Sequence, residues 1–182
     1  RLGEVVVVQG SGPVGLAAAA LAQLSGAATV ILAGGPAGRL ALAAELGIGD
    51  HHVNVVESDD PNAALARVVE LTGGRGADLV VECTGVPAAI AQGLRLARRG
   101  GSYLVVGQYT DGGDTRSALS FSETLTLLKA SPVTVYAIGL VENAGSARTQ
   151  LQMTLRQIAE TTGGQAFFPT AMKDVESAYE KV

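Results

Sequence analysis

Three glycines at a fixed spacing follow a run of β-branched residues near the start of this chain. Four valines, Val5–Val8, precede Gly10, Gly12 and Gly15, and an Ala/Leu-rich segment follows them. A strand, a Gly-x-Gly-x-x-Gly loop and a helix in this order form the context that makes the glycine pattern meaningful. We therefore expect a strand-to-helix connection whose backbone can come very close to another group.

Each glycine has its own physical role in such a loop. Gly10 can adopt the geometry of a tight turn, Gly12 lets a pyrophosphate approach the main chain, and Gly15 lets the helix pack closely on the strand. Unpaired N–H groups at the helix start would face the anion. We therefore predict dinucleotide binding, with a purely structural βα turn as the alternative. The predicted loop contacts are Gly10, Ser11, Gly12, Pro13, Val14 and Gly15.

Length and composition limit the fold that can carry this loop. The 182 residues suffice for one domain with a substantial core, so we expect a single domain over residues 1–182. Hydrophobic residues make up 47% of the chain and aromatic residues only 4%. Such a core is built from Val, Leu, Ile and Ala, as buried parallel sheets usually are.

Charge and cysteine content argue against several classes of protein. A net charge of −4 disfavours a nucleic-acid partner, and no apolar run is long enough to span a membrane. The single cysteine, Cys83, excludes an intramolecular disulfide, and we expect it to be a small buried residue. No secretory signal pattern is present and the chain starts at Arg1, so we expect a processed or excised piece of cytoplasmic origin.

Apolar runs alternate with helical segments, which is typical of a parallel sheet with helices on both faces. Right-handed crossovers and a reversal after the third strand predict a doubly wound, Rossmann-like α/β three-layer sandwich of order 3-2-1-4-5-6 plus a short edge strand. The expected strands are 5–9, 29–33, 53–55, 78–82, 102–107, 133–138 and 166–168. The expected helices are 13–25, 36–46, 62–72, 87–97, 122–130, 148–162 and 175–181.

The end of the second predicted strand bears on cofactor choice. Ala33, followed by Gly34 and Gly35, stands where an acidic residue commonly holds the ribose hydroxyls of NAD. Arg39 could approach a 2′-phosphate and favour NADP, or it could be an ordinary surface charge. Both NAD and NADP therefore stay open.

Residues 3–107 resemble the cofactor domain of medium-chain, zinc-type alcohol dehydrogenases. Besides the glycine loop, the matching segments are 39–47, 71–78, 80–85 and 99–107. The resemblance implies a nicotinamide dinucleotide lying across the sheet. It places Thr84 and Gly85, after the fourth strand, and Val106 and Gly107, after the fifth, beside that cofactor.

The same resemblance implies that zinc ligands come from a separate catalytic domain. A catalytic zinc needs about three ligands of Cys, His or carboxylate type. This chain offers Cys83 and the adjacent pair His51 and His52 on different elements. We therefore expect no zinc, no catalytic residue, and weak NAD or NADP binding in the range of about 1 μM to 1 mM.

Residues 108–182 resemble the second half of a von Willebrand factor A-type domain. The matching segments are 111–115, 133–140, 155–169 and 174–179. Asp111 matches a metal-binding residue of that family, but the family's serine loop is replaced here by the glycine loop. A turn-capping role for Asp111 is therefore favoured. The two resemblances together favour an engineered or recombined chimera with halves 1–107 and 108–182, with a natural divergent loop as the alternative.

Three functional hypotheses follow. We favour a dinucleotide-binding domain of alcohol dehydrogenase ancestry that lacks a complete active site and so has no stand-alone oxidoreductase activity. The second hypothesis is a purely structural chimeric α/β protein with no ligand. The third is a metal-dependent interaction module descended from the A-type half. The sequence predicts no oligomeric state.

Overall fold

Seven strands form one parallel sheet, because runs of aliphatic and β-branched residues fit a sheet that is buried on both faces. In this computed structural model, which describes residues 2–56, 62–108, 121–140, 148–169 and 174, the sheet order is β3-β2-β1-β4-β5-β6-β7. This confirms the predicted order with its additional edge strand. The strands are β1 (Val5–Gln9), β2 (Thr29–Gly34), β3 (His51–Asn54), β4 (Ala77–Glu82), β5 (Ala97–Gln108), β6 (Thr134–Leu140) and β7 (Ala166–Phe167).

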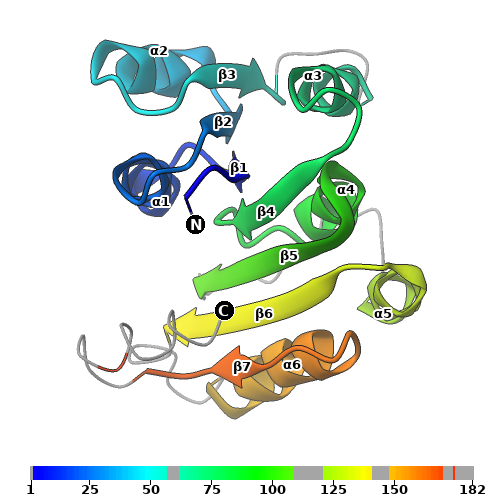
Figure 1. The fold of residues 1–182 in the computed structure, drawn as a ribbon. Coiled ribbons are helices and arrows are strands. Elements are labelled where there is room, and N and C mark those ends of the chain that lie inside the picture. The colour runs from blue at the N-terminus through cyan, green and yellow to red at the C-terminus, as the bar shows by residue number, and fades with distance from the viewer. Residues whose placement is uncertain (1, 57–61, 109–120, 141–147, 170–173, 175–182) are drawn as a thin grey trace.

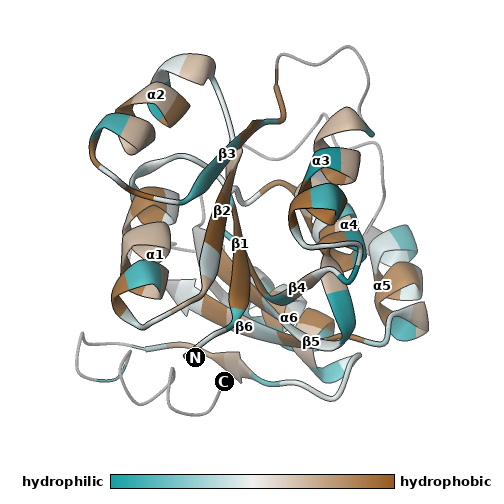
Figure 2. Cartoon of the chain, turned by 45° about the horizontal axis from the view of Figure 1, so that its top comes forward, coloured by the Kyte–Doolittle hydropathy of each residue, from teal (hydrophilic) through white to brown (hydrophobic). Residues whose placement is uncertain are grey.

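Helices cover both faces of the sheet and make a three-layer sandwich (Figure 1). One face carries α1 (Pro13–Leu24) and α2 (Ala37–Glu45), and the other carries α3 (Ala63–Leu71), α4 (Pro87–Leu96), α5 (Phe121–Ala130) and α6 (Arg148–Glu160). The central strands are mostly hydrophobic, whereas hydrophilic residues appear on the helices (Figure 2). The strand order changes direction after β3, because β4 pairs with β1 on the side away from β2. The carboxyl ends of β1 and β4 therefore lie beside each other at this switch point.

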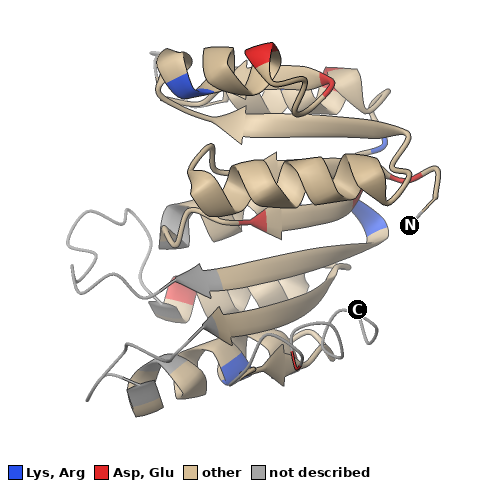
Figure 3. Ribbon diagram, turned by 90° about the vertical axis from the view of Figure 1, so that its left-hand side faces the viewer, with Lys and Arg blue, Asp and Glu red and all other residues tan. Residues whose placement is uncertain are grey.

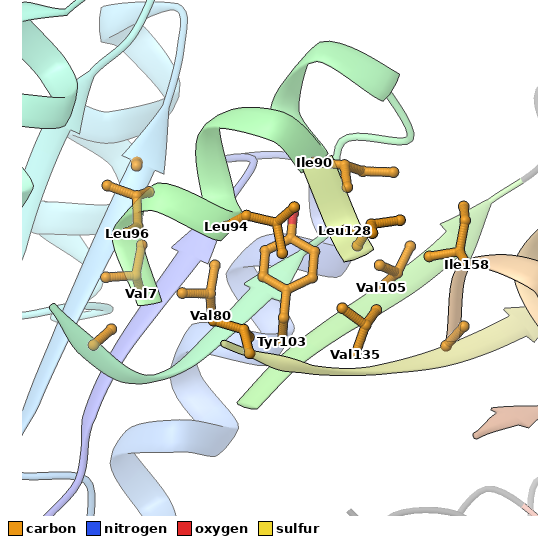
Figure 4. Close-up of a cluster of buried hydrophobic side chains, with 14 of the residues drawn as sticks. Val7, Val80, Ile90, Leu94, Leu96, Tyr103, Val105, Leu128, Val135 and Ile158 are labelled. Carbon is orange, nitrogen blue, oxygen red and sulfur yellow. The ribbon is translucent and has the colours of Figure 1, made fainter. Parts of the chain in front are cut away.

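The core consists of two clusters of buried side chains, one on each face of the sheet. Tyr103 is fully buried near the centre of the α4 side, where Val80, Leu94 and Val105 surround its ring (Figure 4). Its hydroxyl donates to Gln9 Oε1 at 3.0 Å. The polar end of this aromatic side chain is therefore satisfied inside an aliphatic core.

The third strand begins two residues before the predicted range 53–55 and ends one residue before its end. Asp50 N–H donates to Val30 O at 2.8 Å, and Asp50 Oδ2 accepts from Val30 N–H at 2.7 Å. Pairing with β2 therefore starts directly after Asp50, and His51 and His52 are the first residues of β3. The pattern of apolar residues predicted the strand only from residue 53, but the expectation that His51 and His52 lie at a solvated strand start is confirmed.

The fifth strand is longer than the predicted range 102–107 and begins at Ala97. Its pairing with β4 shifts register between Ala77 and Leu79. A Cβ at Gly101 would lie 3.0 to 3.1 Å from three backbone oxygens, so a glycine lets the strand pass this irregularity closely. The predicted helix at 175–181 lies outside the described residues.

Candidate functional site

The glycine loop joins β1 to α1 at the carboxyl edge of the sheet. Gly10 has a φ of +109°, and its N–H donates to Ala33 O at 2.7 Å. A Cβ at Gly10 would lie 3.2 Å from the Cys83 carbonyl group and 3.2 Å from Thr84 Cγ2. The end of β1 is thus in close contact with the segment after β4, and Gly10 supplies a backbone conformation that other residues rarely adopt.

Gly12 and Gly15 differ in the space beside them. A Cβ at Gly15 would lie 1.9 Å from Gly10 O, so α1 packs on the loop only because this residue has no side chain. A Cβ at Gly12 would meet no atom within 4 Å. Gly12 is the N-cap of α1, and no side chain caps this helix end among the described residues. This end of α1 therefore combines open space at the Gly12 side-chain position with the absence of a side-chain cap from the described part of the chain, and an uncapped helix start of this kind attracts anions.

Ser11 links the loop to the segment after β2. Its hydroxyl accepts from Gly35 N–H at 3.0 Å and donates to Gly35 O at 2.9 Å, and the residue is buried. A Cβ at Gly34 would lie 2.7 Å from both the amide nitrogen and the hydroxyl oxygen of Ser11. The serine thus occupies the space into which a side chain at position 34 would project.

The turn after β4 is held by a carboxyl group that the sequence analysis missed. Glu82 Oε1 accepts from Thr84 N–H at 2.6 Å, from Gly85 N–H at 3.1 Å, and from the Thr84 hydroxyl. Thr84 and Gly85 themselves are exposed. A lone acidic residue that ends an apolar strand and precedes Thr-Gly is the signal that could have identified it.

Burial dominates the electrostatics of this turn. Desolvation raises the pKa of Glu82, while the hydrogen bonds from Thr84 and Gly85 act in the opposite direction. Burial, and then the neighbouring Glu82 charge, raise the pKa of the Cys83 thiol to about 12. Cys83 is half-buried rather than buried as expected, because it lies just beyond β4 at the edge of the sheet. Its thiol stays protonated at neutral pH and is a poor nucleophile.

The remaining predicted contacts lie on either side of the loop. Glu82 pairs with Val105 in the sheet, so Val106 and Gly107 reach the level of the turn after β4. The Val106 side chain is buried in the core on the α1 face, whereas Arg39 is exposed in the first turn of α2. Charged residues are scattered singly in the view of Figure 3. The positive end of the α1 dipole therefore contributes to the potential at the loop alongside exposed Arg39.

The described residues do not assemble a metal site. Among them no group of three or more His, Cys, Asp or Glu side chains gathers in one place. His52 Nε2 lies 2.8 Å from Ile48 O, and His51 is exposed at the start of β3. Asp111, the candidate from the A-type resemblance, lies outside the described residues. In the described part of the chain, no helix is long and apolar enough to cross a membrane.

A doubly wound sheet with a glycine loop at the start of α1 and a second exposed turn beside it defines a Rossmann-type α/β domain. The sequence profile of the zinc-binding dehydrogenase family matches residues 13–142, and the chain belongs to this family.

Curated relatives share this likeness over part of their length. An L-threonine 3-dehydrogenase of Bacillus licheniformis is 48% identical over 99 residues, which are 54% of this chain and 27% of the relative. A sorbitol dehydrogenase of Halalkalibacterium halodurans is 43% identical over 109 residues, or 59% of this chain and 30% of the relative. The chain therefore spans less than a third of the length of these relatives.

Solved structures show the same fold. An alcohol dehydrogenase from Thermotoga maritima has a TM-score of 0.60 and 31% identity, and the match covers 88% of this chain and 40% of that one. A zinc-dependent alcohol dehydrogenase from Streptococcus has a TM-score of 0.60 and 28% identity, with 99% and 48% covered.

These matches extend the dehydrogenase-like part of the chain beyond residue 107, where we expected it to end. The family profile continues to residue 142, through the segment that contains α5 and β6. The dehydrogenase likeness therefore does not end at residue 107, and the resemblance to a von Willebrand factor A-type domain gains no support from it. Both families add parallel strands and helices outward from the fourth strand, so their apolar patterns in this region are alike.

Proposed function

We propose that this chain is the nicotinamide dinucleotide-binding part of an alcohol dehydrogenase-like oxidoreductase. The observation that carries the proposal is the contrast within the glycine loop. Gly10 and Gly15 are in tight backbone contact, whereas the side of Gly12 is open and the start of α1 has no side-chain cap. A pyrophosphate over Gly12 would accept hydrogen bonds from amides of the first helical turn.

The neighbouring turn would hold the other half of the cofactor. Thr84 and Gly85 are exposed beside Gly10, which favours contact with a dinucleotide that crosses from β1 to β4. Val106 and Gly107 would contribute backbone atoms, since the Val106 side chain is turned into the core. The bound nicotinamide would accept or deliver a hydride. We assign no catalytic residue to this chain, because in the family that it resembles the zinc ligands come from a separate catalytic domain.

The choice between NAD and NADP depends on the end of β2. Ala33 stands where the acidic residue was expected, and Ser11 fills the space beside the next residue, so an acidic side chain at position 34 could not fit either without moving the loop. A ribose with free hydroxyls therefore lacks its usual carboxylate partner there, whereas exposed Arg39 could reach a 2′-phosphate. Both cofactors remain in the proposal, and titration of each decides between them. Arg39→Ala should weaken NADPH binding and leave NADH binding unchanged.

Calorimetric titration of the folded chain with NADH and NADPH tests the proposal. We expect a Kd between about 1 μM and 1 mM for at least one of them. Gly12→Val should abolish binding without unfolding the protein, because the added side chain enters the open space over the loop. A chain that unfolds cooperatively and binds neither cofactor at millimolar concentration would instead be a purely structural protein.

A chimeric origin of residues 108–182 is a separate proposal. The alignments with curated relatives extend over only about as many residues as the predicted first half, for example 99 and 109 residues. Alignments of this length are compatible with a junction near residue 107, whereas the family match up to residue 142 disfavours one. Alignment of residues 108–182 alone with both families provides the test. A match to dehydrogenases alone would exclude the chimera.

A further inference from the structure

A buried carboxyl group lies directly under the exposed turn that follows β4. Only 1% of Glu82 is exposed, yet its Oε1 atom accepts both backbone N–H groups of Thr84 and Gly85 and the Thr84 hydroxyl. The Thr84 hydroxyl oxygen in turn accepts from Val86 N–H at 3.0 Å. One oxygen atom therefore orders the segment that leads into α4.

This turn is also coupled to the glycine loop. Cys83 N–H donates to Gln9 O at 2.8 Å, and Gly10 lies against the Thr84 methyl group. Gln9 pairs with Glu82 in the sheet, and its side-chain amide donates to Ala89 O at 3.0 Å. Buried polar groups of Gln9 and Glu82 thus connect the start of α4, the turn after β4 and the glycine loop.

We propose that Glu82 is a positioning residue for the dinucleotide, because it fixes the Thr84–Gly85 turn against the glycine loop. The inference rests on the function proposed above. Glu82 does not touch the cofactor, since the turn covers its carboxyl group. Its effect on binding is transmitted through the backbone of Thr84 and Gly85.

Because the second carboxyl oxygen of Glu82 makes no hydrogen bond within the described part of the chain, substitutions can separate the effect of the hydrogen bonds to the turn from the effect of the charge. Glu82 Oε2 is buried and has no hydrogen-bond partner among the described residues. A glutamine at this position keeps the length and the accepting oxygen but loses the charge. An aspartate keeps the charge but is one methylene shorter, so its oxygen cannot reach Thr84 and Gly85 in the same way.

The experiment is a calorimetric titration with NADH and NADPH of the wild-type chain, Glu82→Gln and Glu82→Asp. We expect Glu82→Gln to change the Kd by no more than about threefold, and Glu82→Asp to raise it about tenfold, since several hydrogen bonds to the turn are lost. Amide hydrogen exchange without cofactor should show faster exchange at Thr84 and Gly85 in Glu82→Asp only.

Asp78→Ala is the control, because it changes another carboxylate of strand β4, which is half-buried and lies at the amino-terminal ends of the strands, away from the turn. It should lower stability and leave the Kd unchanged. Equal Kd values for Glu82→Asp and wild type would overturn the inference, as would a tenfold loss in Glu82→Gln. A wild-type chain that binds neither cofactor would contradict the proposed function itself, whatever the exchange rates at the turn.

Discussion

At the scale of single residues, different glycines of the loop are needed for folding and for binding. Gly15 has no room for a side chain, whereas Gly12 faces open space with a φ of −77° that any residue tolerates. We predict that Gly15→Ala destabilises the fold by about 1–3 kcal/mol or more, since the added methyl overlaps Gly10 O. Gly12→Ala should change stability by less than about 1 kcal/mol but weaken dinucleotide binding.

Urea unfolding and calorimetric titration of both variants distinguish these effects. The matched pair differs only in which loop glycine gains a methyl group. A stable Gly15→Ala variant would show that α1 can move away from the loop at little cost. Full cofactor affinity in Gly12→Ala would mean that the pyrophosphate does not lie over this residue.

Glu82 should make stability depend on pH. Desolvation raises its pKa in the folded protein above the ordinary value of 4.5, so the stability associated with its protonated form is complete below 4.5. That stability is lost as the pH rises through the folded-state pKa. In Glu82→Gln this loss should disappear, and the variant should gain on wild type as the pH rises from 4.5 toward neutral.

Urea unfolding at a series of pH values checks this sign. Cys83 and Tyr103 are the titratable neighbours on which Glu82 acts, and both have pKa values raised by burial, so neither titrates in this range. Parallel curves for the variant and wild type would contradict the account. A variant that falls behind wild type at high pH would reverse the sign.

Sequence reasoning found the loop residues but not their supports. Gly10, Gly12 and Gly15 belong to a pattern with a known physical purpose, so their geometry followed from spacing. The contact of Glu82 with Thr84 joins a strand to the turn after it, and the bond from Tyr103 to Gln9 spans 94 residues. Periodicity carries no information about such pairings.

At the scale of elements, Asp78 ties three strands together near their amino-terminal ends. Its Oδ2 atom accepts from Val5 N–H at 2.8 Å, and its Oδ1 atom pairs with Arg98 Nε at 2.6 Å. Desolvation alone would raise the pKa of Asp78, but the hydrogen bond from Val5 and the Arg98 guanidinium together lower it. The stability it contributes is present above 3.8 and is lost as the pH falls through the lower folded-state pKa.

We predict that Asp78→Ala costs about 1–3 kcal/mol, because the Val5 N–H at the half-buried start of β1 loses its acceptor. Arg98→Ala should cost less than about 1 kcal/mol, since solvent screens this partly exposed pair. Urea unfolding in low salt and in 1 M NaCl measures both values. If salt removed most of the Asp78→Ala effect, the ion pair rather than the bond to Val5 would be the main contribution.

The strand order was predictable because it follows from the alternation of elements and the handedness of crossovers, whereas strand ends were not. β3 begins at His51 because Asp50 pairs with β2, and β5 extends back to Ala97 around a register shift. Side chains and glycines at these positions act through partners on other strands. Strand ends that are predicted from local sequence can therefore be wrong by several residues.

At the scale of the whole molecule, one sheet crosses the boundary expected at residue 107. β5 and β6 pair in register from Ser102 with Thr134 to Gln108 with Leu140. We predict a single cooperative unfolding transition, because no break in the ladder separates the two halves. Hydrogen exchange in increasing urea should expose β1 and β6 amides at the same denaturant concentration. Earlier exposure of β6 would indicate two independent units.

The central claim is that the main-chain amides at the start of α1 form the binding site of a nicotinamide dinucleotide. The most direct measurement is an NMR titration of the ¹⁵N-labelled chain with NADH and with NADPH. The account predicts that the amide signals of Gly12, Val14, Gly15, Thr84 and Gly85 shift together with one shared Kd. Absence of any shift at millimolar cofactor, or shifts confined to residues around Asp78 at the opposite edge of the sheet, would contradict it.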